Sequence, residues 1–147
     1  MKKFIFDVDG TLMDIEHRRH FVTQRPKDFD AFRGPEVVMQ DTPNKEIFAL
    51  AKALKDAGNR IIVSTGRNKR QRATTLKQLM MNGLVFDAMY MRGDTDFRPD
   101  DELKKGFLIK MKEDGFNPVM AVDDRQQVVD MFRAEGLRVL QVDKGDF

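Results

Sequence analysis

The chain has 147 residues, enough for one domain that buries a core of its own, and it contains no cysteine, which excludes disulfide bonds, thiolate metal sites and a cysteine nucleophile. Lys and Arg outnumber Asp and Glu by 26 to 24, so any attraction to polyanions must come from local clusters rather than from the net charge of +2. No apolar segment is long enough to span a membrane, and the first one ends at Asp7, too early for a signal peptide, so we expect a cytoplasmic protein without a membrane partner.

Short apolar segments alternate with amphipathic ones along the chain. The apolar segments have the composition of buried strands and lie at Phe4–Phe6, Arg60–Val63, Ala88–Met91, Val119–Val122 and Val139–Val142. The amphipathic segments have helical spacing, end before a glycine and lie at Asn44–Ala57, Asn68–Asn82, Asp100–Asp114 and Arg125–Glu135. This alternation predicts an α/β fold with a mostly parallel sheet, in which ligands bind beyond the carboxyl ends of the strands.

Polar residues follow three of the predicted strands. Asp7 and Asp9 follow the first strand, STGR (residues 64–67) the second, and Asp123 and Asp124 the fourth. Each group alone is explained as a turn, a strand exit or a helix N-cap, but together they indicate a functional site. Carboxylates that converge to about 4 Å repel each other by roughly 1 kcal/mol per pair even in water, and a divalent cation removes that cost. Because these strand ends offer oxygen ligands and neither His nor Cys, they point to Mg²⁺ and a phosphoryl group.

Four stretches of the chain resemble the motifs of the haloacid dehalogenase (HAD) superfamily of phosphotransferases. They are DVDGT from Asp7, STGR after the second strand, Lys104 at a helix start, and VDD from Val122. A closer similarity, to the 3′-phosphatase domain of phage polynucleotide kinases, is carried by MRGDTDFRPDDELKK, VDDRQQVVDMFRAEGL and the terminal GDF. It is strong for Asp7–Leu12 and from about Arg60 onward. The resemblance implies one HAD-like (Rossmann-like) three-layer domain over residues 1–147, with five strands in the order 5-4-1-2-3.

The resemblance also implies residue roles. Asp7 would be the nucleophile that forms an aspartyl-phosphate, and Asp9 the general acid that protonates the leaving oxygen and later activates water. Asp7 is ionised at neutral pH and needs no base, whereas Asp9 must be protonated for part of the cycle and therefore needs a perturbed pKa. The expected catalytic residues are Asp7, Asp9, Thr65 and Lys104; the expected substrate-binding residues are Thr65, Gly66, Arg67, Lys69, Arg70, Arg72 and Arg125; and the expected Mg²⁺ ligands are Asp7, the Asp9 carbonyl, Asp123 and Asp124.

Two features depart from the closer relatives. No GxxxxGK[ST] motif occurs, so the kinase activity of a polynucleotide kinase is not expected. The stretch HRRHFVTQRPKDFDAFRGPE does not match the phage 3′-phosphatase pattern. It lies in a segment of about 12–42 that is too short for a large cap domain, and we expect it to form a small lid beside the site.

Two basic clusters allow more than one interpretation. RNKRQR, residues 67–72, places four cations at an expected helix N-terminus, where the helix dipole disfavours positive charge. It is either a solvated helix face or a contact for a polyanion beside the phosphate site. His17 and His20 could form a metal pair on a helix face, but no acid lies at ligand spacing, which favours a substrate-facing or solvated basic face.

Three functions remain open on the sequence. The favoured one is a Mg²⁺-dependent phosphomonoesterase that removes 3′-phosphate from nucleic-acid ends or nucleotides, as in nucleic-acid repair, with a separately encoded kinase or ligase as a partner. If the protein is phage-encoded, it would act in the host cytoplasm. The alternative is a small-molecule phosphatase such as a 5′(3′)-nucleotidase, whose lid closes over a free metabolite. A non-catalytic module that binds nucleic-acid ends is disfavoured, because every expected catalytic position is filled.

Overall fold

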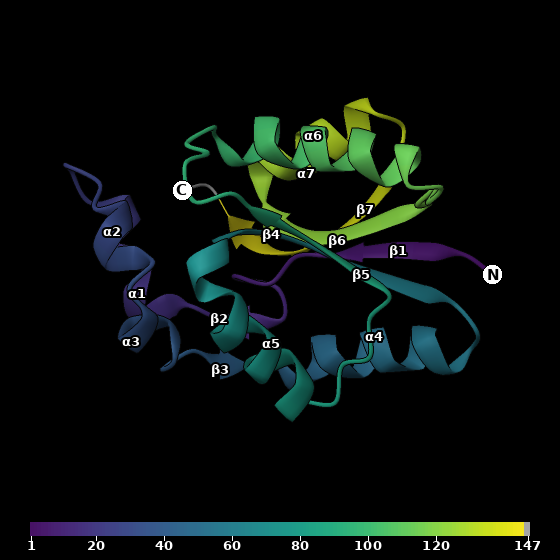
Figure 1. Cartoon of the computed structure of the whole chain (residues 1–147), viewed down its shortest axis with the longest axis horizontal. Coiled ribbons are helices and arrows are strands. Elements are labelled where there is room, and N and C mark those ends of the chain that lie inside the picture. Colours follow the sequence, from purple (N-terminus) through teal and green to yellow (C-terminus); the bar gives the residue numbers. More distant parts are fainter. Residues whose placement is uncertain (146–147) are drawn as a thin grey trace.

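Five parallel strands form the main sheet of the computed structural model, which describes residues 1–145. Asp146 and Phe147, which end the GDF stretch, lie outside the described residues. The strands are β1 (Lys3–Phe6), β4 (Arg60–Asn68), β5 (Ala88–Arg92), β6 (Met120–Arg125) and β7 (Arg138–Gly145). They lie side by side in the order β5-β4-β1-β6-β7, and all four neighbouring pairs are parallel (Figure 1). Counted without the two short strands of a second sheet, this is the predicted order read from the opposite edge.

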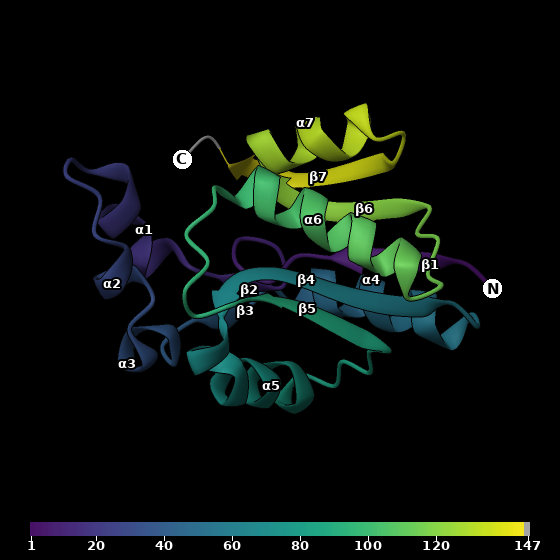
Figure 2. The same ribbon diagram turned by 45° about the horizontal axis from the view of Figure 1, so that its top comes forward.

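Two helices cover each face of the sheet (Figures 1 and 2). These helices are α4 (Lys45–Asp56) and α5 (Arg72–Met81) on one face, and α6 (Asp100–Glu113) and α7 (Gln126–Ala134) on the other. All four were predicted, but α5 begins four residues later than expected. A 3₁₀ helix at Lys69–Gln71 precedes it, because Asn68 and Gln71 form a capping box that ends β4. No helix within residues 1–145 has the length and apolar character needed to cross a membrane.

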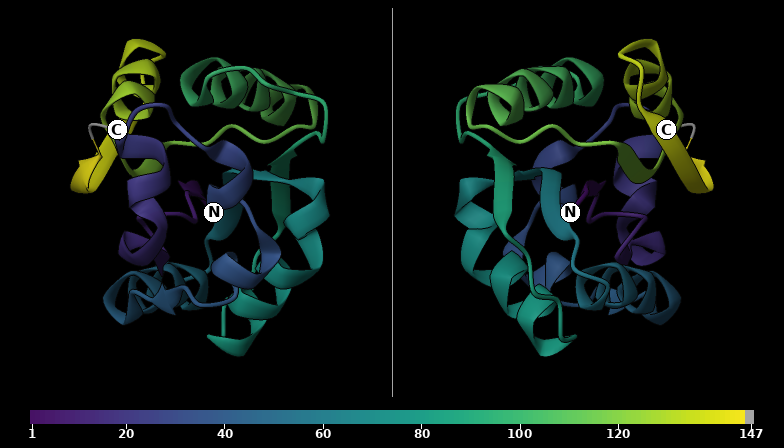
Figure 3. Two further views of the ribbon diagram at one scale, coloured as in Figure 1. Left: turned by 90° about the vertical axis from the view of Figure 1, so that its left-hand side faces the viewer. Right: turned by 90° about the vertical axis from the view of Figure 1, so that its right-hand side faces the viewer.

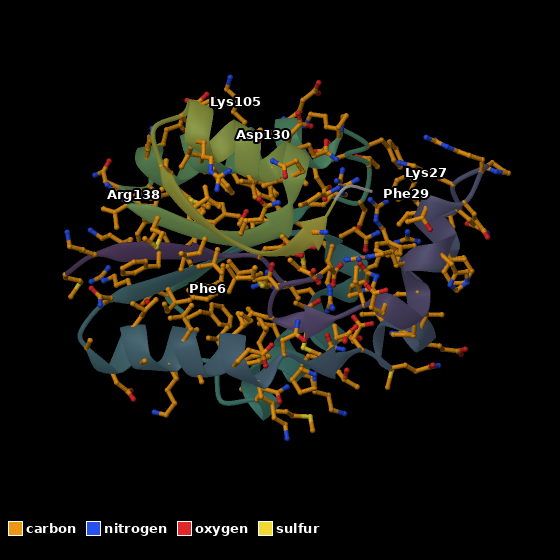
Figure 4. The ribbon with its side chains drawn as sticks, turned by 180° about the vertical axis from the view of Figure 1, so that it is seen from behind. Phe6, Lys27, Phe29, Lys105, Asp130 and Arg138 are labelled. Atoms are coloured by element: carbon orange, nitrogen blue, oxygen red, sulfur yellow. The ribbon has the colours of Figure 1, made fainter. Side chains whose placement is uncertain are left out.

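The core has two halves because successive side chains of β1 point to opposite faces of the sheet. Phe6 packs in a cluster with Phe48 of α4 and Leu79 of α5, and Figure 4 shows Phe6 between the sheet and α4. Ile5 packs in the other cluster with Phe132 of α7. A strand buried on both faces reads as a continuous apolar run, which is why FIF was recognisable in the sequence.

Residues 13–43, called the insertion below, connect β1 to α4. They contain the short strands β2 (Met13–Asp14) and β3 (Thr42–Pro43), which pair antiparallel, and the helices α1 (Glu16–Thr23), α2 (Phe29–Phe32) and α3 (Pro35–Val38). The insertion lies at the end of the molecule to which the carboxyl ends of the strands point (Figures 1 and 3). Ile15, Val22 and Phe32 form a small apolar cluster inside the insertion.

Candidate active site

Three buried carboxylates meet where β1 and β6 end. The two strands are parallel neighbours with Phe6 opposite Val122, so Asp7, the residue after β1, comes to lie beside Asp123 of β6. The Asp7 amide continues the ladder by donating to the Val122 carbonyl at 3.0 Å. Asp7, Asp123 and Asp124 each offer a carboxylate oxygen, and these oxygens lie within 4.8 Å of one another. The structure thus brings together three of the acids that follow the predicted strands, whereas Asp9 is not part of this group.

Lys104 of α6 is the cation inside this cluster. Its ammonium donates to Asp7 Oδ1 at 2.8 Å and to Asp123 Oδ2 at 2.9 Å, and its side chain is buried. Burial alone would lower the pKa of Lys104, but the charges of Asp123 and Asp7 raise it above its ordinary value. Lys104 therefore stays protonated and fixes the position of Asp7.

One ammonium does not balance three buried carboxylates. Burial and the charge of Asp123 raise the pKa of Asp7 well above its usual range, although Lys104 opposes them, and the same two causes raise the pKa of Asp124 to about 6. Asp124 Oδ2 is buried and accepts no hydrogen bond, and the guanidinium of Arg19 approaches it only to 3.7 Å. A buried, unsatisfied carboxylate oxygen with excess negative charge around it suits a hard divalent cation, and the all-oxygen donor set fits Mg²⁺.

The loop after β1 shapes the cluster through Gly10 and Thr11. Gly10 has φ +79°, and a Cβ there would lie 2.2 Å from Asp124 Oδ2, so a side chain has no room. The Thr11 hydroxyl donates to Asp7 Oδ2 at 2.9 Å and lies 3.4 Å from Asp124 Oδ1. Sequence reasoning assigned no role to Thr11, although it stands within DVDGT. The structure shows that both oxygens of Asp7 are held, one by Lys104 and the other by Thr11.

Asp9 has a very different environment from Asp7. Its Oδ1 accepts from Arg18 Nη2 at 2.7 Å and from Arg67 Nε at 2.9 Å. Burial alone would raise the pKa of Asp9, but Arg18 and Arg67 outweigh it and lower the pKa to about 2. The sequence led us to expect a perturbed pKa at Asp9 that allows protonation. In this structure the perturbation has the opposite sign, because two guanidinium groups face the carboxylate.

Asp41 of the insertion joins both arginines from the other side. It accepts from Arg18 at 2.7 and 2.8 Å and from Arg67 at 2.8 Å, and its side chain is fully buried. His17 also contacts Asp41, at 2.6 Å. Arg18 and Asp41 were missed by sequence reasoning, which treated HRRH as a solvated or substrate-facing surface. The antiparallel pairing of β2 with β3, which brings the two ends of the insertion together, is seen in the structure and not in the residue spacing.

The histidine pair considered above does not form a metal site in the described part of the chain. The ring of His17 contacts Asp41, whereas the ring of His20 packs against that of Phe21, tilted by 39°, with 4.0 Å between ring centroids. Within residues 1–145, the group with ligand geometry is the cluster of Asp7, Asp123 and Asp124.

A pocket opens above these two carboxylate environments. The sheet edge and α6 contribute its charged floor, and the insertion contributes Val22, Phe29, Phe32 and Arg33 to its walls. Among the residues proposed from sequence, the pocket is lined by Asp7, Asp9, Gly66, Arg67, Lys104, Asp123, Asp124 and Arg125. Thr65 lies beneath this surface, fully buried, and its hydroxyl accepts from the Arg67 amide at 3.1 Å.

Three of the predicted substrate-binding residues lie outside the pocket. Lys69, Arg70 and Arg72 are exposed around the 3₁₀ helix and the start of α5, and they do not line the pocket. Arg125 does line it, and it donates to Asp100 at 2.7 Å. The run RNKRQR is thus divided: Arg67 is buried beside Asp9, whereas the remaining three cations face solvent, and their substrate contact stays a prediction.

Comparisons with known proteins agree with this geometry. A family model described as the polynucleotide kinase PNKP phosphatase domain matches residues 1–147. Among solved structures, the chain is similar to a chain of the Pnkp1/Rnl/Hen1 complex, with a TM-score of 0.82 and 30% identity. That match covers 99% of this chain and 47% of the other, so the chain spans about half the length of this relative.

Two structures of lower identity share the fold. One is a predicted phosphatase from Clostridium acetobutylicum, with a TM-score of 0.70, 16% identity, and coverage of 95% of this chain and 83% of the other. The other is D,D-heptose 1.7-bisphosphate phosphatase from B. bronchiseptica complexed with magnesium and phosphate, with a TM-score of 0.56, 19% identity, and coverage of 96% and 80%. The family match over residues 1–147 identifies the chain as a HAD-superfamily phosphohydrolase that belongs to the family of the polynucleotide kinase phosphatase domain.

Proposed function

We propose that the chain is a Mg²⁺-dependent phosphomonoesterase that removes the terminal 3′-phosphate from a nucleic-acid end. The observation that carries the proposal is the setting of Asp7, which lines the pocket and is held by Lys104 and Thr11 beside two further carboxylates. The similarity to a chain of the Pnkp1/Rnl/Hen1 RNA repair complex supports a nucleic-acid end, including an RNA end, as the substrate. It also supports partner enzymes that act on the same ends, such as a separately encoded kinase or ligase.

Asp7 is the nucleophile of the first step. Lys104 and Thr11 hold both of its oxygens, which fixes the direction of attack and favours the ionised form against the effect of burial. An Asp7 oxygen forms a bond to phosphorus while the bond between phosphorus and the ester oxygen breaks. The products of this step are an aspartyl-phosphate on Asp7 and the freed alcohol of the nucleic-acid end.

Asp9 transfers protons in both steps. Its ion pairs with Arg18 and Arg67 keep it ionised in this structure, which suits a base that takes a proton from water in the second step. That water oxygen attacks phosphorus, the bond to Asp7 breaks, and inorganic phosphate leaves. Protonation of the leaving oxygen in the first step requires these ion pairs to loosen, and a substrate phosphate near Arg67 competes for the same guanidinium.

The residues that would hold Mg²⁺ are Asp7, Asp123, Asp124 and the main-chain carbonyl of Asp9. When bound, the ion neutralises the excess negative charge of the carboxylates and of the phosphate, which lets a carboxylate approach a phosphate dianion. The unsatisfied Asp124 Oδ2 is the observation in this chain that supports such a ligand.

A small-molecule phosphatase is the second candidate. Val22, Phe29 and Phe32 of the insertion line one wall of the pocket, and such a wall suits a lid that closes over a free nucleotide. The same wall also fits a lid that leaves a path for a nucleic-acid strand. The two functions are therefore distinguished by whether the protein prefers oligonucleotides or mononucleotides as substrates.

The test is phosphate release from a substrate panel with Mg²⁺ present. The panel contains 3′- and 5′-phosphorylated DNA and RNA oligonucleotides and the matching mononucleotides, with Asp7→Asn as the control for a contaminating phosphatase. We expect the highest kcat/KM for 3′-phosphorylated oligonucleotides. A higher kcat/KM for mononucleotides than for oligonucleotides would contradict the proposal and favour the nucleotidase.

A further inference from the structure

A second groove continues from the active-site pocket to the surface. It runs between the insertion, which contributes Lys27, Phe29 and Arg33, and the connection from β5 to α6, which contributes Phe97 and Arg98. Figures 1 and 2 show that connection approaching the insertion at the carboxyl edge of the sheet, and Figure 4 shows Lys27 and Phe29 at this end of the molecule. Phe29, Arg33, Asp100 and Arg125 line both the pocket and the groove, so the two are continuous. The name Phe29–Phe97 groove is used below for this surface.

The groove gathers exposed aromatic rings. Phe97 is 82% exposed and Phe29 is 39% exposed, although water contact is unfavourable for both. Among the exposed large apolar side chains of residues 1–145, these two are the aromatic ones, and both line the same groove. Exposed apolar side chains that occur singly need no explanation, but two rings placed together beside an active site indicate a ligand with a flat face.

Cations accompany the rings. The guanidinium carbon of Arg33 lies 5.0 Å from the centroid of the Phe29 ring, and Lys27 Nζ lies 5.9 Å from it. Within residues 1–145 neither Lys27 nor Arg33 has a carboxylate at ion-pair distance. Burial is the largest cause that lowers the pKa of Arg33 and the charge of Arg92 adds to it, whereas Asp100, Asp9 and Asp30 act in the opposite direction. The phosphates of a polyanion would pair with Lys27 and Arg33.

A site for single-stranded nucleic acid combines two components. One is aromatic rings with an accessible face, and the other is cationic side chains without a carboxylate partner. Successive bases stack on aromatic side chains while the cations follow the phosphates, and every base has a face that can stack. We propose that the Phe29–Phe97 groove binds the unpaired nucleotides that precede the 3′-phosphate, with a base on Phe97 and backbone phosphates near Lys27 and Arg33. This inference rests on the proposed function, because it assumes that a nucleic-acid end enters the pocket.

The Phe29–Phe97 groove is separate from the exposed cations of the RNKRQR run, which the sequence suggested as a polyanion contact. Lys69, Arg70 and Arg72 have no aromatic neighbour among the ring contacts of the described residues, and they line neither the pocket nor the groove. They therefore provide a matched charge control. The proposal predicts that the strand leaves the pocket past Phe97 rather than past this cluster.

The test compares Phe97→Ala and Lys27→Ala with the triple variant Lys69→Ala/Arg70→Ala/Arg72→Ala. Neither Phe97 nor Lys27 lines the active-site pocket, and Phe97 is largely exposed, so Phe97→Ala leaves the core intact. The measurement is kcat/KM for a 3′-phosphorylated single-stranded oligonucleotide and for p-nitrophenyl phosphate, which has no base or second phosphate. We expect Phe97→Ala to lower the value for the oligonucleotide by roughly tenfold and to leave that for p-nitrophenyl phosphate within about twofold of wild type.

A direct binding measurement keeps the inference separate from turnover. In the Asp7→Asn background, an oligonucleotide with 2-aminopurine as its last base should lose fluorescence on binding, and Phe97→Ala should abolish that loss. Unchanged oligonucleotide kinetics and quenching in Phe97→Ala, an equal loss on both substrates, or a larger loss in the triple variant would each overturn the groove. Failure of the proposed function has a different signature: wild type would hydrolyse p-nitrophenyl phosphate and leave the 3′-phosphorylated oligonucleotide intact.

Discussion

Asp7 and Asp9 are two residues apart, yet they belong to two regions of opposite character. Asp7 lies among carboxylates that the sheet itself brings together, and its pKa is raised by burial and by Asp123. Asp9 lies between two arginines, one of them from the insertion, and its pKa is lowered to about 2. The comparison teaches that the end of a strand can separate two identical side chains into different tasks, because β1 ends at Phe6 and the chain turns after Asp7, which places Asp9 against Arg18 of the insertion.

The largest expected effect on activity comes from a change in the acidic region, which is formed by Asp7, Asp123 and Asp124 with Lys104. Asp7→Asn should lower kcat by about three orders of magnitude or more, because an amide does not attack phosphorus. The fold should persist, since the substitution removes one charge from a crowded acidic cluster. Stopped-time phosphate release and a thermal unfolding curve measure the two effects. Activity within tenfold of wild type would remove Asp7 from the role of nucleophile.

The metal dependence of the same region comes next. EDTA should abolish activity and Mg²⁺ should restore it, and Asp124→Asn should raise the Mg²⁺ concentration needed for half-maximal activity. Because Mg²⁺ binds the folded protein, it should also raise the Tm of the wild type, and by less in Asp124→Asn. Full activity in chelator, or an equal Tm shift in both proteins, would contradict the metal site.

A smaller effect on activity is expected from a change at Asp41 in the basic region, which is formed by Arg18 and Arg67 with their partners Asp9 and Asp41. Asp41→Asn removes the shared partner of Arg18 and Arg67, and a displaced arginine pair should lower kcat/KM by about tenfold to a hundredfold. Loss of a buried ion-pair partner should also lower the free energy of unfolding by roughly 3–5 kcal/mol.

The Mg²⁺ requirement separates the two regions in this experiment. It should be unchanged in Asp41→Asn, because Asp41 contacts none of the metal-binding carboxylates, and kinetics should be recorded well below the lowered Tm. Glu36→Gln, an exposed change on α3 of the same insertion, is the matched control and should behave as wild type. A raised Mg²⁺ requirement in Asp41→Asn would show that the acidic and basic regions act as one unit.

The smallest effect is expected at the exposed cations that adjoin the basic region. Replacing Lys69, Arg70 and Arg72 with Ala should change kcat/KM for a 3′-phosphorylated oligonucleotide by less than about threefold at moderate salt, because these side chains line neither pocket nor groove. The measurement is repeated at two salt concentrations, since each phosphate contact that is lost reduces the salt dependence. A large loss together with a reduced salt slope would restore this surface as the path of the strand.

The acidic region could be predicted from the sequence, whereas in the basic region Asp9 and Arg67 were expected but their contacts with Arg18 and Asp41 were not. Asp7 and Asp123 follow apolar strands that are recognisable without a structure, and parallel strands end at one edge of a sheet. The contact between Arg18 and Asp41 joins two parts of an irregular segment. Because this segment has no regular hydrophobic spacing, no local pattern in the sequence predicts the contact.

The extended end of β4 explains a further error. Gly66 suggested that the strand ends early and that a helix starts at Asn68, whereas β4 continues to Asn68 and turns Arg67 into the interior. The Phe29–Phe97 groove also depends on how two connections approach each other in space, which residue spacing does not report.

The division of tasks between Asp7 and Asp9 is tested most directly by trapping the intermediate. Asp9→Asn should still let Asp7 attack p-nitrophenyl phosphate, whose leaving group needs no proton, but it should slow the attack of water. After an acid quench, peptide mass spectrometry should find a phosphoryl group on Asp7 of this variant and none in Asp7→Asn/Asp9→Asn. Phosphoryl transfer to another residue, or turnover of the substrate without any phosphorylated peptide in Asp9→Asn, would contradict the account.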